Sequence, residues 1–175
     1  MGEIRLVRPE PEHERAVMEY RAEFLRDGDD LAGTAGLRNK ESYLAWMNAV
    51  LADEFSETVR QGLVEATTFL ALRESDGALI GFIQVRHRLN DYLTQFGGHI
   101  GYSVRSSERQ KGYATEMLRQ ALLYAKTLGL MKALVTCNND NEASRRTIVS
   151  NGGVLENEVV EECGQVVQRY WIALS

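Results

Sequence analysis

The chain has 175 residues, a length that fits one domain able to bury its own hydrophobic core. Its formal net charge is −5 and no lysine/arginine cluster is dense enough to follow a phosphate backbone, which argues against nucleic acid as a partner. The sequence has no run of about 18 apolar residues and no signal-peptide pattern at its charged start, so we expect a cytoplasmic protein that does not bind or span a membrane.

The first third of the chain reads as one strand followed by helical segments. Apolar and polar residues alternate after Glu3 as they do in a strand, and helical spacing of apolar residues follows. In the second helix we expect Leu44 to be buried and Trp46 to lie beside the buried stripe. The expected elements are a strand over Ile4–Arg8, helices over Glu12–Arg26 and about Glu41–Leu51, a flexible loop over Gly33–Gly36 and a partly helical segment over Asp53–Glu65.

From Thr67 onward the pattern predicts strands, joined first by a hairpin and then by helices. Asp76 and Gly77 supply the positive φ angles that a tight hairpin needs, and Asn139 with Glu142 has the spacing of a capping box. The expected elements are strands over Thr68–Arg73, Leu79–Arg86, His99–Val104, Lys132–Cys137, Val154–Glu161 and Gln165–Ala173, a polar loop over His87–Phe96, and helices from the next turn to about Leu128 and over Asn139–Ser150. This order predicts one α/β domain.

The turn Arg109-Gln110-Lys111-Gly112-Tyr113-Ala114 lies between an apolar strand and a long amphipathic helix. The first N–H groups of a helix have no intrahelical partners and lie at the positive end of its dipole, so they suit phosphate or pyrophosphate. Gly112 lets the backbone approach phosphate oxygens, while Arg109 and Lys111 add positive charge. The single glycine of this turn fits neither the P-loop nor the dinucleotide fingerprint.

The pattern Arg109-x-x-Gly112-x-Ala114 resembles the acyl-CoA pyrophosphate loop of the GNAT N-acetyltransferase superfamily. Farther along, Asn141-x-x-Ser144 resembles the second cofactor element of that family, and the strand order is similar over essentially the whole chain. The run from Gly98 to Arg109 is similar to an uncharacterised bacterial branch of predicted acetyltransferases. The resemblance implies a GNAT-like mixed central β-sheet flanked by helices, a single domain over residues 1–175, and acetyl-CoA as cosubstrate without a metal.

The resemblance also assigns residues to the cofactor. Backbone amides of the turn would hold the pyrophosphate, and the end of the preceding strand would splay from its neighbour and pair with the pantetheine arm like an added strand. Each of the two residues in the second element also has a simpler reading, a helix cap for Asn141 and a solvated first-turn serine for Ser144. The implied cofactor-binding residues are Ser103, Val104, Arg109, Gln110, Lys111, Gly112, Tyr113, Ala114, Thr115, Asn141 and Ser144.

The implied reaction moves an acetyl group from acetyl-CoA to the amine of a small molecule or peptide. In many family members a tyrosine on the second helix donates a proton to the thiolate, but Ile148 occupies that position here. The CoA thiol has an ordinary pKa of about 8.5, so the thiolate would then leave unprotonated or take its proton from water or another side chain. His99 is the candidate base, its alternative reading being a strand histidine bonded to the backbone; Asp91 and Tyr92 are weaker candidates.

Other readings remain open at this point. Ile148 leaves room for a non-catalytic acyl-CoA-binding module that senses the cofactor or regulates a partner. The acidic balance favours a cationic or amine acceptor without identifying it, and the family resemblance allows a homodimer. Cys137 and Cys163 are expected to be reduced, with Cys137 in the core.

Overall fold

The computed structural model describes residues 2–175. Their strands form one seven-stranded sheet. The strands are β1 (Ile4–Val7), β2 (Ala66–Arg73), β3 (Leu79–Arg86), β4 (Ile100–Val104), β5 (Lys132–Asn138), β6 (Val154–Val160) and β7 (Val166–Ala173). Their order across the sheet is β1-β2-β3-β4-β5-β7-β6. Neighbours are antiparallel except β4 and β5, which are parallel, so the sheet is mixed as predicted.

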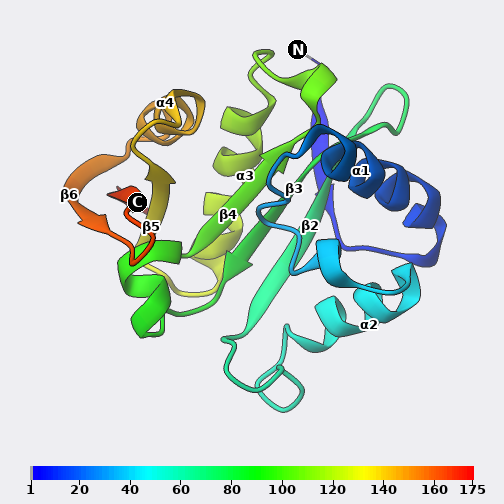
Figure 1. The fold of residues 1–175 in the computed structure, drawn as a ribbon, viewed down its shortest axis with the longest axis horizontal. Helices are drawn as coiled ribbons and strands as arrows, with labels where there is room; N and C mark the ends of the chain where they lie inside the picture. The colour runs from blue at the N-terminus through cyan, green and yellow to red at the C-terminus, as the bar shows by residue number, and fades with distance from the viewer. Residues whose placement is uncertain (1) are drawn as a thin grey trace.

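Helices cover both faces of this sheet (Figure 1). The α-helices are α1 (Glu14–Asp27), α2 (Tyr43–Ala52), α3 (Tyr113–Thr127) and α4 (Glu142–Ser150). Four short turns of other helix types are η1 (Pro11–His13), η2 (Leu37–Asn39), η3 (Leu93–Gly97) and η4 (Ser106–Glu108). In Figure 1, α1 and α2 lie on one side of β2 and β3, whereas α3 lies on the other side. Within residues 2–175, no helix combines the length and the apolar character needed to cross a membrane.

The strands feed two apolar cores because their side chains alternate between the faces of the sheet. Leu70 and Phe82 belong to the core under α1 and α2, and the Phe82 ring meets the Trp46 ring edge-on, with centroids 5.8 Å apart. Ile83 and Val85 belong to the core under α3 and α4. A two-sided core of this kind fixes the register of the central strands, because a slip of one residue would exchange the two apolar sets.

The parallel pair β4–β5 is joined at one register position, Ile100 opposite Val135. Just before it, the His99 N–H donates to the carbonyl oxygen of Leu134 at 2.7 Å. Toward their C-terminal ends the two strands share no further register pair in the described chain. We call this unpaired part of β4 and β5 the splay. It leaves the β4 edge beyond Ile100 without a partner strand.

In α2 the predicted positions of Leu44 and Trp46 are wrong. Leu44 is 60% exposed, whereas Trp46 is 0% exposed. The helix starts at Tyr43, two residues later than predicted, because the Ser42 side chain accepts a hydrogen bond from the Ala45 N–H and caps it. From that start, the face that meets the sheet carries Tyr43, Trp46, Met47 and Val50.

Two turns also differ from expectation. The segment Asp53–Glu65 forms turns rather than a helix, since the buried Asp53 carboxylate accepts bonds from the Arg60 backbone at 3.1 Å and from its guanidinium at 2.5 Å. In the β2–β3 hairpin only Gly77 has a positive φ, +70°. Asp76 acts instead through its carboxylate, which accepts from the Ala78 N–H at 3.1 Å.

Both cysteines are free thiols as expected, Cys137 being buried.

Candidate active site

A cavity of about 950 Å³ lies along the unpartnered edge of β4, between that edge and the first turns of α3 and α4. The loop between α1 and α2 closes its remaining side. The structure brings all the residues predicted to bind the cofactor, apart from Lys111, to the lining of this one cavity. They are Ser103, Val104, Arg109, Gln110, Gly112, Tyr113, Ala114, Thr115, Asn141 and Ser144.

The turn into α3 has the backbone of an anion-binding loop. Gln110 has φ +61° and Gly112 has φ +85°, and the left-handed region is uncommon for a residue with a side chain. Gly112 is the N-cap of α3, and no side chain among residues 2–175 accepts a capping bond there. The N–H groups of Tyr113–Thr115 therefore point out of the helix start without an intrahelical partner. Such groups suit a phosphate oxygen.

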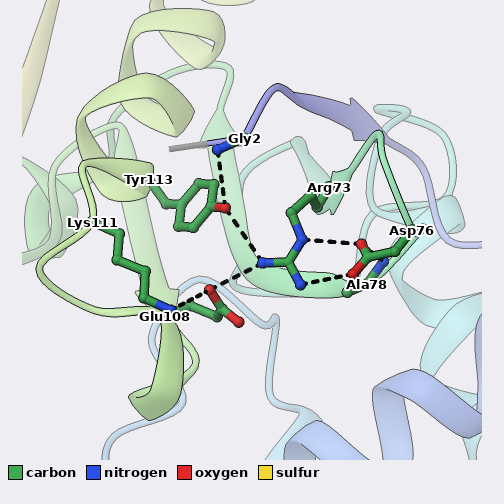
Figure 2. A network of polar contacts seen from close by, with 7 residues as sticks. All are labelled: Gly2, Arg73, Asp76, Ala78, Glu108, Lys111 and Tyr113. Atoms are coloured by element: carbon green, nitrogen blue, oxygen red, sulfur yellow. Dashed lines mark hydrogen bonds and ion pairs between the residues drawn. The ribbon is translucent and has the colours of Figure 1, made fainter.

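Arg73, at the end of β2, holds this turn from behind (Figure 2). Its Nη1 donates to Glu108 Oε2 at 3.2 Å and to the Tyr113 hydroxyl oxygen at 3.4 Å, while its other nitrogens pair with Asp76. Lys111 Nζ donates to the same Glu108 oxygen at 3.1 Å. The Lys111 side chain is therefore directed to Glu108 and not into the cavity, which leaves only its backbone N–H near the predicted pyrophosphate site.

This ion-pair network sets the charge state of its carboxylates. The Arg73 guanidinium lowers the pKa of Asp76 to about 2. Burial alone would raise the pKa of Glu108, but its bonds to Lys111 and Arg73 bring that pKa below its usual value. Both carboxylates are thus ionised and paired at neutral pH, and the turn keeps its shape over the physiological range.

Arg109 ties the end of β4 to the α1–α2 loop. Its Nε donates to the Val104 carbonyl oxygen at 2.9 Å and its Nη2 to Asp29 Oδ2 at 2.8 Å, with the guanidinium 5.6 Å from the centre of the Phe24 ring. Glu142, another carboxylate of the lining, is paired with two arginines of α4. Because these charges are largely compensated, attraction for an anion rests chiefly on the backbone N–H groups and the dipole of α3.

Successive residues of β4 direct their backbone N–H and C=O groups alternately toward β3 and toward the splay. At the ends of the β3–β4 ladder, Arg86 N–H donates to His99 oxygen at 2.7 Å and Arg105 N–H donates to Ile80 oxygen at 2.8 Å. In an antiparallel ladder every second residue is bonded to the same neighbour. The register therefore directs the backbone groups of Ser103 toward β3.

The backbone groups on the free edge belong to Tyr102 and Val104, one residue either side of Ser103. Only the N–H of Val104 is available there, because its carbonyl oxygen accepts the hydrogen bond from Arg109. Ser103 reaches the cavity lining with its own atoms, but its hydroxyl accepts a hydrogen bond from the Tyr20 hydroxyl at 3.0 Å. The sequence predicts that Ser103 pairs with the pantetheine arm through its backbone. In the register observed, the free backbone groups at this place are those of Tyr102 instead.

Asn141 caps α4, and its Oδ1 accepts from the Ser144 N–H at 3.1 Å. The capping box predicted for Asn139 and Glu142 is wrong, since the helix begins at Glu142 and its N-cap is therefore Asn141. The cap places both residues of the second cofactor element on the cavity wall. Ser144 Oγ lies 2.7 Å from the hydroxyl oxygen of Tyr102, which reaches it from β4.

Tyr102 lines the cavity but is not among the residues predicted from the sequence. Burial raises the pKa of its phenol to about 12, although the hydrogen bond with Ser144 opposes the rise. The alternation Ile100, Tyr102, Val104 in β4 is the signal that puts its ring on the face of the sheet where α4 lies. Ile148 is 0% exposed and belongs to the core rather than to the cavity lining.

His99 lies outside the cavity lining and is 5% exposed. Its Nδ1 accepts a hydrogen bond from the Leu134 N–H at 2.9 Å. Burial, with a further contribution from the positive charge of Arg86, lowers its pKa to about 4. The ring is therefore neutral and bonded to the backbone at neutral pH, and we do not retain it as the base. Asp91 and Tyr92 also lie away from the lining.

The α1–α2 loop touches β4 at the start of the splay. Gly33 has φ +74°, and a Cβ there would lie 2.4 Å from the carbonyl oxygen of Gly101, so only glycine fits this approach. Gly101 directly follows Ile100, the last residue of β4 that is paired with β5. The loop in which we expected an acceptor to enter thus borders the splay.

Solved acetyltransferases share this fold at low sequence identity. The spermidine N-acetyltransferase of Vibrio cholerae, solved with CoA and spermine, is 18% identical with a TM-score of 0.66, over 98% of this chain and 95% of that chain. An acetyltransferase of Salmonella typhimurium that modifies the N-terminal serine of a 50S ribosomal subunit protein is 14% identical with a TM-score of 0.69, again over 98% and 95%. A ribosomal-protein alanine acetyltransferase of Vibrio fischeri is 17% identical with a TM-score of 0.65, over 98% and 92%.

The fold is therefore that of the acetyltransferases. The family model described as an acetyltransferase (GNAT) domain matches residues 3–154, and the chain belongs to this family. No curated protein matches the sequence. Members of the family use acetyl-CoA, so the chain is an acetyltransferase, as the resemblance of the turn and of the second cofactor element predicts.

Proposed function

We propose that this protein transfers an acetyl group from acetyl-CoA directly to the amine of a small molecule or a peptide. The observation that carries the proposal is the single cavity that joins the uncapped start of α3, the free edge of β4 and the capped start of α4. These three elements present different donors to one elongated ligand. Family membership supports the acetyl transfer, while the amine is our inference.

The donor set of the cavity fits CoA. The N–H groups of Gln110–Thr115 suit the pyrophosphate, and the left-handed Gln110 and Gly112 direct several of them to one point. The free carbonyl oxygen of Tyr102 and the N–H of Val104 suit the amides of the pantetheine arm, in the manner of an added strand. The Asn141 side-chain oxygen accepts the hydrogen bond that caps α4. Its side-chain N–H groups remain available to donate to the pantetheine arm.

The remaining chemistry follows from where the donors lie. Acetyl-CoA, when bound, supplies a thioester activated for acyl transfer. The Tyr102 N–H faces the splay and is placed to stabilise negative charge on a thioester oxygen. The acceptor amine must be neutral to attack, so it has to lose its proton to water or to a base beforehand. We assign the side of the α1–α2 loop to the acceptor because Gly33 borders the splay there.

Two classes of acceptor belong in a first screen. The Vibrio cholerae neighbour is named for spermidine and the Salmonella typhimurium neighbour for an N-terminal serine, so a small amine and a peptide N-terminus both deserve a trial. The net charge of −5 favours cationic acceptors in the encounter step. Polyamines, amino acids and short peptides with free N-termini should therefore be assayed together.

The proposal is tested with Gly112→Val and a matched control. Valine is strongly disfavoured at φ +85°, so the variant should distort the turn and weaken CoA binding by about 100-fold or more, which corresponds to about 3 kcal/mol. Gly129→Val introduces a similar strain at φ +88° beyond the other end of α3, away from the cavity, and should keep CoA affinity. Calorimetric titration with CoA measures both, and thermal unfolding checks that each variant is folded.

Turnover is measured as CoA release from acetyl-CoA with the amine panel. Release that requires an amine and is lost in Gly112→Val supports the proposal. Tight CoA binding without turnover of any amine would instead favour a non-catalytic acyl-CoA-binding module. Absence of CoA binding by the wild type would overturn the assignment of the cavity.

A further inference from the structure

We propose that the Tyr102 hydroxyl donates the proton to the CoA sulfur as it leaves, a role for which Ile148 offers no group. The inference rests on the proposed function, because it needs CoA in the cavity along β4. It assigns a catalytic role to a strand residue whose side chain crosses to α4.

The position of Tyr102 is the first argument. It lies two residues beyond Ile100, where β4 and β5 are last paired, so it stands at the inner end of the splay. Its side chain extends from β4 to the first turn of α4, where its hydroxyl oxygen lies 2.7 Å from Ser144 Oγ. Both residues line the cavity. A ligand arm that follows the free edge of β4 therefore runs beside this phenol.

The second argument is that other tyrosine hydroxyls around β4 are directed elsewhere. Tyr113 also lines the cavity, but its hydroxyl oxygen accepts from Arg73 Nη1 and from the Gly2 N–H behind the α3 turn (Figure 2). The Tyr20 hydroxyl donates to Ser103 and Tyr20 itself does not line the cavity. The Tyr102 hydroxyl is the one that meets a residue of the second cofactor element.

The hydrogen-bond chemistry of the pair allows a proton to pass. When Ser144 Oγ donates to the phenol oxygen, the phenol hydrogen has only the long contact with the Ser144 carbonyl oxygen, at 3.4 Å, and can turn from it to a ligand atom in the cavity. The phenol is protonated at neutral pH even at its ordinary pKa of about 10, and burial raises that pKa further, to about 12. A protonated donor next to the splay is what a departing thiolate needs.

The step balances without any further reactant. The C–N bond to the acceptor forms as the C–S bond of the thioester breaks, and the phenol O–H bond of Tyr102 breaks as the S–H bond forms. The tyrosinate then recovers a proton from water through the Ser144 hydroxyl. The water in turn has received the proton released by the acceptor amine, so one proton moves from nitrogen to sulfur overall.

An equilibrium measurement isolates the contact with sulfur. We compare the dissociation constants of CoA and desulfo-CoA at about pH 9.5, above the ordinary thiol pKa of about 8.5, so that free CoA is mostly thiolate. Tyr102→Phe should weaken CoA binding by about tenfold or more, as expected for loss of a hydrogen bond to a charged atom, and leave desulfo-CoA binding unchanged. Tyr113→Phe, the matched control, should change the two affinities by the same factor.

A kinetic measurement then separates a proton donor from a structural hydroxyl. Tyr102→Phe should lower kcat by about 100-fold with little change in the KM for acetyl-CoA. Replacement of Tyr102 by 3,5-difluorotyrosine keeps the hydroxyl but makes the phenol more acidic. This variant should be active at neutral pH and lose kcat as pH rises, an alkaline limb that the wild type shows only at higher pH.

The outcomes distinguish the inference from the function on which it rests. If the wild type binds CoA and turns over an amine, but Tyr102→Phe affects CoA and desulfo-CoA equally, the inference is wrong and the function stands. An unchanged pH profile in the difluorotyrosine variant would have the same meaning. If the wild type does not bind CoA, the proposed function itself is overturned.

Discussion

The imidazole of His99 lies at the closed end of the splay, where its Nδ1 accepts a hydrogen bond from the Leu134 N–H and its backbone N–H donates to the Leu134 carbonyl. A protonated ring has no acceptor nitrogen, so protonation would break the first of these bonds. Burial and the charge of Arg86 oppose protonation in the folded state. The His99 side chain thus links β4 to β5 only while it is neutral, whereas the backbone bond does not depend on its charge.

This linkage makes stability depend on pH. The pKa of His99 is about 4 in the folded state against an ordinary value of about 6.5, so the unfolded chain binds the additional proton first as pH falls. The contribution of the neutral ring is complete above about pH 6.5 and is lost as pH falls from there to about 4. The shift corresponds to about 3 kcal/mol in the free energy of unfolding.

His99→Asn tests this prediction, because an amide oxygen can accept from the Leu134 N–H but does not titrate. Denaturant unfolding of both proteins from pH 7 to pH 4 should show a smaller acid loss of stability in the variant. Its kcat at neutral pH should stay within a fewfold of the wild type. Equal acid losses would exclude the linkage, and a collapse of kcat in a folded variant would restore His99 as a catalytic base.

The same residues show how far sequence reasoning reaches at this scale. The turn around Gly112 is predictable because a glycine at a helix start and the exposed first amides are local properties. The outward direction of Lys111 is not, since it depends on Glu108 and on Arg73 from a distant strand. Tyr102 was missed for a similar reason. Its importance arises only when α4 is placed opposite β4.

At the scale of elements, regular periodicity predicted the strands and helices well, and the misjudged segments are those set by tertiary contacts. The amphipathic pattern of α3 and the β2–β3 hairpin are local and were predicted nearly to their ends. The turns after Asp53 depend on its ion pair with Arg60 across a buried position. The π-helical turn η3 within the predicted polar loop has no comparable sequence signal.

The start of α4 combines two roles in one side chain. The Asn141 oxygen caps the helix, whereas we assign its side-chain N–H groups to the pantetheine arm. Aspartate keeps the capping oxygen and loses the donors, while alanine loses both. The pair of substitutions therefore separates helix stability from ligand binding.

Asn141→Ala should lower the free energy of unfolding by about 1 kcal/mol, and Asn141→Asp should leave it nearly unchanged. Both variants should bind CoA about tenfold more weakly, since each lacks the donor. Chemical denaturation and calorimetric titration measure the two effects. Wild-type CoA affinity in Asn141→Asp would show that Asn141 acts as a cap alone.

At the scale of the whole molecule, the splay divides the sheet into two parts. The part with β1 to β4 carries α1, α2 and α3, and the part with β5 to β7 carries α4 (Figure 1). Besides the strand pair at Ile100 and Val135, the parts share the apolar core under α3 and α4, and Asn151 Nδ2 donates to the Thr115 oxygen at 3.1 Å. The cavity takes its lining from both parts. A ligand that fills it therefore adds a connection that the sheet itself lacks.

This arrangement predicts that CoA stabilises the protein and protects particular amides. At a free concentration of 100 times its dissociation constant, CoA should add about 2.7 kcal/mol to the free energy of unfolding. For a chain of this size, that corresponds to a rise in Tm of about 5–10 °C. At the same CoA concentration the gain should fall to about 0.4 kcal/mol or less in Gly112→Val, whose affinity for CoA is about 100-fold lower.

Hydrogen exchange of β4 tests the same idea with a control inside the strand. The N–H groups of Tyr102 and Val104 lie on the free edge, whereas the N–H of Ser103 is bonded to β3 in both states. On CoA binding, exchange at Tyr102 and Val104 should slow, and exchange at Ser103 should change little beyond the global gain in stability. Equal slowing at all three amides would mean that CoA stabilises the fold without lying along β4. Protection confined to the start of α3 would place only the pyrophosphate as proposed, because the pantetheine arm would then leave the free edge of β4 in water.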